Sequence, residues 1–154
     1  MTRLNLKLLL AALLALAAPA AWAEPLAIVV DRDNPKTDLS AEELKSIYLG
    51  KRTEWSDGAR AVPIDQDPAG ASHGAFLGGV LGMSQGQFAQ HWVDQQVRGA
   101  GSAPKVASSP ASAMKLVAKV RGAVAFVPAS LVDASVKVVT LNGKKAGDAG
   151  YALP

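Results

Sequence analysis

Two spacings of apolar residues alternate along the chain after its first two dozen positions. Short, nearly continuous apolar runs are typical of buried strands, whereas apolar residues three or four positions apart indicate helices with one buried face. Runs of the first kind predict strands at 26–30, 61–64, 123–127 and 136–141, with a brief extended piece at 105–107. Helical spacing predicts helices at about 41–49, 73–81, 84–97 and 110–121.

Capping residues support these helix starts. Two pairs have the Ser-x-x-Glu or Ser-x-x-Gln spacing of a capping box, namely Ser40 with Glu43 and Ser84 with Gln87. Ser109 followed by Pro110 places a cap before a proline at the first helical position. Ser72 is expected to cap the helix that carries Phe76.

The order of elements is strand, helix, strand, two helices, strand, helix and two strands. This alternation predicts an α/β sandwich with a mostly parallel sheet flanked by helices. Phe88, Trp92 and Val93 are expected to face inward from the helix at 84–97, and Tyr48 and Trp55 to seal a corner between helix and strand. The residues expected to form the core are Ile47, Phe76, Val80, Trp92, Val117 and Phe126.

The first residues have the layout of a secretory signal. Arg3 and Lys7 precede an apolar run at 8–18 that is too short to span a membrane, and Ala21-Trp22-Ala23 supplies the small residues of a cleavage site. We therefore expect a signal peptide at 1–23 and a periplasmic domain at 24–154, with no membrane span after cleavage.

Composition narrows the classes of function. Lys and Arg number 16 against 13 Asp and Glu, but Arg3 and Lys7 would leave with the signal, so the remaining domain is nearly neutral. Basic runs are no longer than Lys51-Arg52 or Lys144-Lys145 and aromatic residues are few, so we expect no nucleic-acid partner. The absence of cysteine excludes disulfides, thiolate metal sites and cysteine nucleophiles.

The sequence favours a binding function over an enzymatic one. His73 and His91 are the only candidate bases, and neither accompanies a G-x-S-x-G nucleophile motif. Asp31-Arg32-Asp33 resembles the start of a calcium loop, but Lys36 replaces the required glycine. We expect no catalytic residues, no cofactor and no bound metal.

Several stretches resemble the phosphate-type substrate-binding proteins of ABC transporters. They are 39–50, Trp55 with Gly58, Val62-Pro63-Ile64, Phe76, Trp92 and 122–127. The resemblance extends over roughly 26–141 and implies a periplasmic-binding-protein-like domain of type II, in a small single-lobe version. The phosphate loop of that family has an arginine followed by Ser-Gly-Thr, whereas this chain has Gly70-Ala71-Ser72, with Asp65-Gln66 where the arginine is expected.

The loop at Gly70, Ala71, Ser72 and His73 is the candidate ligand site. A helix start offers unpaired N–H groups and partial positive charge to an anion, and a protonated His73 could donate a further hydrogen bond. Asp65 would repel an anion there, and Ser72 could simply cap its helix. Two functions remain open: weak binding of phosphate or another small oxyanion, with an ABC transporter as partner, or an interaction module that pairs with an envelope protein or with a second copy of the chain.

Overall fold

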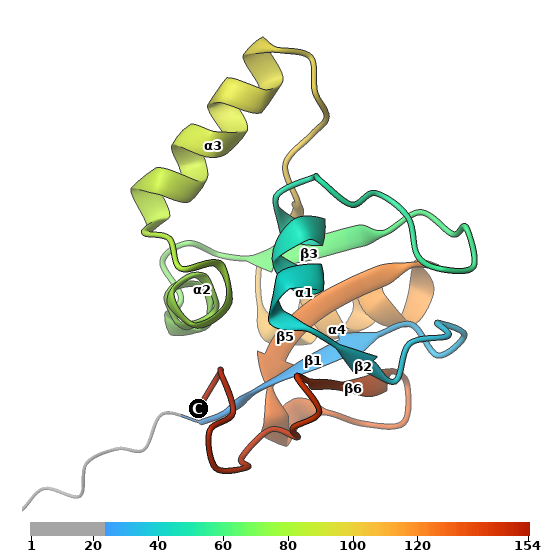
Figure 1. The fold of residues 1–154 in the computed structure, drawn as a ribbon. Coiled ribbons are helices and arrows are strands. Elements are labelled where there is room, and N and C mark those ends of the chain that lie inside the picture. The colour runs from blue at the N-terminus through green and yellow to red at the C-terminus, as the bar shows by residue number, and fades with distance from the viewer. Residues whose placement is uncertain (1–23) are drawn as a thin grey trace, which may run out of the picture.

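A six-stranded sheet forms the centre of the computed structural model, which describes residues 24–154 (Figure 1). The strands are β1 (Leu26–Val30), β2 (Asp38–Leu39), β3 (Val62–Gln66), β4 (Lys105–Ala107), β5 (Ala123–Pro128) and β6 (Lys137–Leu141). They lie in the order β2-β6-β1-β5-β3-β4, and β1 alone runs against the others. The predicted α/β sandwich with a mostly parallel sheet is confirmed.

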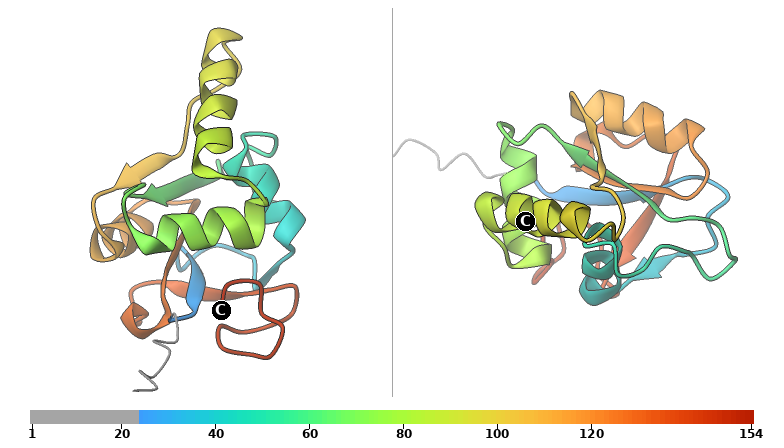
Figure 2. Two further views of the ribbon diagram at one scale, coloured as in Figure 1. Left: turned by 90° about the vertical axis from the view of Figure 1, so that its left-hand side faces the viewer. Right: turned by 90° about the horizontal axis from the view of Figure 1, so that it is seen from above.

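Helices cover both faces of this sheet. They are α1 (Ala41–Tyr48), α2 (Ala71–Phe76) with its π-helical continuation η1 (Leu77–Leu81), α3 (Gln85–Val97) and α4 (Pro110–Lys119), with a 3-10 turn, η2, at Ala129–Leu131. In Figure 2, right, α4 lies on one side of the strands and α1 on the other, and buried residues of α1 and α2 share one apolar cluster. Two apolar clusters follow from this layering, because alternate strand residues face opposite sides: Val124 and Phe126 enter one cluster, and Ala125 and Val127 enter the other.

Three of the four predicted N-cap residues cap their helices in the structure. The Ser40 hydroxyl accepts from the Glu43 N–H at 3.0 Å, and Ser84 with Gln87 forms the second capping box. Ser109 caps α4 ahead of Pro110. The fourth expectation is wrong: Gly70 is the N-cap of α2, so Ser72 lies inside the helix.

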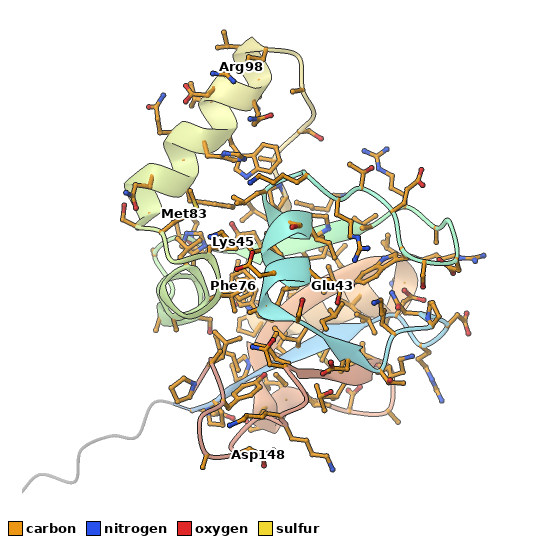
Figure 3. The ribbon with its side chains drawn as sticks, in the orientation of Figure 1. Glu43, Lys45, Phe76, Met83, Arg98 and Asp148 are labelled. Carbon is orange, nitrogen blue, oxygen red and sulfur yellow. The ribbon has the colours of Figure 1, made fainter. Side chains whose placement is uncertain are left out.

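The helix α3 stands away from the rest of the molecule (Figure 2, left; in Figure 3 Arg98 marks its free end and Met83 its base). Phe88 and Trp92 are buried as predicted, but Val93 is 51% exposed, so its predicted inward position is wrong. Only a narrow face of α3 is buried against the domain. That face carries Phe88 and Trp92, and Val93 lies outside it.

Aromatic side chains join α1 and α2 to the sheet. Phe76, which Figure 3 shows pointing from α2 toward the sheet, stacks on Phe126 with ring centroids 4.1 Å apart, and Tyr48 packs against Phe76 at 4.6 Å. The Tyr48 hydroxyl donates to the carbonyls of Ile64 and Val124, which belong to neighbouring strands. Burial raises the pKa of Tyr48 well above its ordinary value, so its hydroxyl remains a donor.

The remaining core predictions are also confirmed. Each of the six residues expected in the core is at most 7% exposed. Trp55 is buried and donates from Nε1 to the carbonyl of Gly122 at 2.9 Å. A Cβ at Gly122 would lie 1.9 Å from the carbonyl oxygen of Arg60, so this corner tolerates only glycine.

Replacing Phe76 by alanine should cost about 3–5 kcal/mol of unfolding free energy, because the ring is fully buried between two other rings. Chemical denaturation measures the loss. Val93→Ala, at an exposed position of α3, is the control and should change stability by less than about 0.5 kcal/mol. A loss at Phe76 no larger than that of the control would show that the aromatic cluster does not hold α2 in place.

Candidate functional site

The loop between β3 and α2 is built around Asp67. Its carboxylate accepts from the N–H of Ala69 at 2.9 Å, and its carbonyl accepts from the N–H of Gly70 at 2.8 Å. This turn closes two residues before Ser72, which explains why the helix begins at Ala71 and Ser72 is not its cap. No side chain caps α2, so the N–H groups of its first turn are left for water or a ligand.

The four predicted ligand-site residues lie in this first turn with different exposures. Gly70 and Ala71 are exposed, and Ser72 is partly exposed. His73 is only 2% exposed and its ring lies edge-on to Phe88 of α3. Gly70, Ala71 and part of Ser72 are therefore the parts of the site that face solvent.

His73 forms a buried pair with Asp65 at the end of β3. Its Nδ1 lies 2.8 Å from Oδ1 of Asp65, which also accepts from the N–H of Gln66 at 2.7 Å. Asp65 is 4% exposed. The sequence suggested His73 as a donor to ligand and Asp65 as a source of repulsion, whereas in the structure each is the other's partner, fastening α2 to β3.

Gln66 occupies the place where the family resemblance puts an arginine. Its side-chain amide donates to the carbonyl of Phe126, within the sheet. The side chain therefore stabilises the contact between β3 and β5 and supplies no positive charge to the loop. An anion at this loop would depend on main-chain N–H groups and the Ser72 hydroxyl.

Other polar residues that attracted attention in the sequence have structural partners. His91 Nε2 lies 3.0 Å from the carbonyl oxygen of Leu49. Asp31 accepts from the N–H of Gly122 at 2.8 Å and from that of Asp33 at 3.2 Å. Within residues 24–154 there is no group of three or more His, Asp or Glu placed to hold a metal, and no helix of that part is long and apolar enough to cross a membrane.

The fold is that of substrate-binding proteins from ABC transporters. A phosphate ABC transporter substrate-binding protein from Clostridium perfringens, solved with bound phosphate, matches with a TM-score of 0.67 and 23% identity over 80% of this chain. An ABC-type phosphate transport receptor from Vibrio cholerae matches at 0.66 and 24% over 80%, and a phosphate-binding protein from Stenotrophomonas maltophilia at 0.63 and 14% over 80%. This chain spans 47%, 48% and 40% of their respective lengths.

The family assignment rests on a longer sequence match. The profile of the PBP superfamily domain matches residues 17–151, which is most of the chain. The chain belongs to this family. The resemblance found in the sequence is confirmed, and the similar structures are binding proteins or transport receptors.

His73→Ala should lower the free energy of unfolding by about 2–4 kcal/mol, because it leaves a buried carboxylate without its side-chain partner. Denaturant unfolding measures this. His91→Ala, which removes a half-buried ring with one bond to a main-chain carbonyl, should cost about 1 kcal/mol.

The double variant His73→Ala/Asp65→Ala separates the stability that comes from the His73–Asp65 contact from the stability lost by removing each side chain's packing. Its loss should be smaller than the sum of the two single losses, since removing either residue already breaks the same contact. Losses that simply add would contradict a coupled pair.

Proposed function

We propose that this chain is an exported, non-enzymatic solute-binding domain that binds a small oxyanion such as phosphate at the Gly70–His73 loop. One observation carries the proposal. The fold of this chain matches, over 80% of its length, slightly less than half of each of three proteins described as binding or transporting phosphate. An ABC transporter is the corresponding partner.

The geometry of the loop supports an anion as the ligand. The first turn of α2 has no side-chain cap, and its leading residues, Gly70 and Ala71, are exposed. The helix continues directly into η1, so the N–H groups at its start carry partial positive charge. Ser72, a partly exposed residue, adds a hydroxyl. The His73–Asp65 pair fixes the helix from beneath, which reduces the ordering cost of binding.

The same geometry supports weak binding. The loop has no guanidinium of its own to hold two oxygens at once, and an anion on an open turn faces water. We expect a dissociation constant nearer millimolar than micromolar, corresponding to roughly −4 to −6 kcal/mol. A second copy or a partner protein closing over the loop would raise the affinity.

Ser72→Ala should weaken phosphate binding by about two- to twelvefold, since it removes one hydrogen bond worth roughly 0.5–1.5 kcal/mol. It should leave stability nearly unchanged, because Ser72 does not cap α2. Ser84→Ala is the matched control: it removes a true cap, costs about 1 kcal/mol of stability, and should leave binding unchanged.

Calorimetry with phosphate and sulfate measures both effects. Tight phosphate binding that persists in the Ser72→Ala variant would show that the binding site lies elsewhere. Binding of neither anion by the natural protein would reject the solute-binding proposal and favour an interaction module.

Export follows from the proposed signal at 1–23, which lies outside the described residues. Glu24 should be the first residue of the exported protein. An intact mass of the exported protein that still includes residues 1–23 would contradict cleavage after Ala23.

A further inference from the structure

A concave site lies at the opposite end of β3 from the Gly70–His73 loop. It is a cleft of about 480 Å³ between the first residues of β3, the end of α1, Trp92 of α3 and the 100–104 connection to β4. Its volume falls within the range of small-molecule sites. Its accessible apolar lining comes from Val62, Pro63 and Ala103, with the nearly buried Ile47 and Trp92 behind them.

Close packing of α3 on α1 holds one wall of this cleft. Gly50 has a φ of +73°, and a Cβ there would lie 2.8 Å from Cη2 of Trp92, so glycine permits the indole to sit against the end of α1. His91, next to Trp92, contacts the carbonyl oxygen of Leu49 at 3.0 Å. The wall is therefore anchored although α3 otherwise projects from the domain.

The charged residues among those that line the cleft are all basic. They are Arg52, Arg60 and Lys105, and no Asp or Glu is among the lining residues. Arg52 is already paired with Glu43 at 2.5 Å. Within residues 24–154, Arg60 and Lys105 have no carboxylate within ion-pair distance, although the main chain of Arg60 pairs with that of Glu54.

Glu43 keeps Arg52 engaged over the physiological pH range. Hydrogen bonding to Lys36, to the Ser40 N–H and to Arg52 lowers the pKa of Glu43 from 4.5 to about 2 against the opposing effect of burial. Arg60 and Lys105 are thus the two cations free to meet an anion in the cleft.

We propose that this cleft binds a small organic anion with an apolar body, such as an aryl or alkyl carboxylate. The acid group meets Arg60 and Lys105, and the body lies against Val62, Pro63 and Ala103. A bare inorganic oxyanion would gain nothing from the apolar lining, whereas an uncharged apolar compound would leave the two cations without a partner. The site is separate from the Gly70–His73 loop and goes beyond the function proposed for it.

Calorimetry with 4-phenylbutyrate tests the proposal on the natural protein. We expect saturable binding that weakens by at least about tenfold in the Arg60→Ala/Lys105→Ala variant, since each removes a charge-assisted contact. Arg32→Ala/Lys145→Ala is the matched control, because it also removes one exposed arginine and one exposed lysine, both outside the cleft, and should leave binding unchanged. The uncharged 4-phenylbutan-1-ol should bind at least about tenfold more weakly than the carboxylate.

The Ser72→Ala variant distinguishes this site from the loop. It should bind 4-phenylbutyrate as the natural protein does, whether or not phosphate binds at Ser72. No binding of 4-phenylbutyrate, equal binding of the alcohol, or equal loss in the Arg32/Lys145 control would each overturn the proposal. Melting temperatures of all variants establish that they are folded.

Discussion

The buried pair of His73 and Asp65 holds the start of α2 against the end of β3, and the shape of the candidate loop depends on it. At 2.8 Å between ring and carboxylate, with both side chains almost fully buried, the pair fixes the direction in which the first turn of α2 presents its N–H groups. The aromatic stack of Phe76 on Phe126 fixes the next turn. The main chain and the Ser72 hydroxyl are thus the groups left for binding at the loop, on a helix that these side-chain contacts hold in place.

The strand β3 connects two chemically different surfaces. At its end, an open turn offers N–H groups and one hydroxyl, which suits a small, strongly hydrated oxyanion held weakly. At its beginning, a cleft offers apolar walls and two free cations, which suits a larger anion with an apolar body. The chain spans about half the length of the phosphate transporter proteins that it resembles.

Structural features that depend on residues close together in the sequence can be predicted from it, whereas features that depend on contacts between distant segments cannot. The Ser40 and Ser84 capping boxes follow from residues three positions apart. The sequence predicts Ser72 as the cap of α2, whereas the turn at Asp67 makes the helix begin earlier, with Gly70 as its N-cap. Val93 fits the apolar period of α3, but periodicity does not say how wide a strip of a helix will dock.

The candidate loop could be located from the sequence, whereas its internal bonding could not. Helix-start chemistry and the family resemblance both pointed to Gly70–His73. The pairing of His73 with Asp65 has no signal in spacing, since it needs β3 and α2 to meet at one angle. The cleft was missed for the same reason, because segments near residues 50, 62, 92 and 104 meet only in the fold.

The most direct test of the central claim is a phosphate titration of the ¹⁵N-labelled protein followed by its amide signals. The uncapped N–H groups at the solvent-facing start of α2 should report the anion, so the amides of Ala71 and Ser72 should shift and saturate together at millimolar phosphate, on the order of the expected dissociation constant. Saturating shifts confined to other parts of the chain, or no shifts up to high phosphate, would contradict an oxyanion site at this loop.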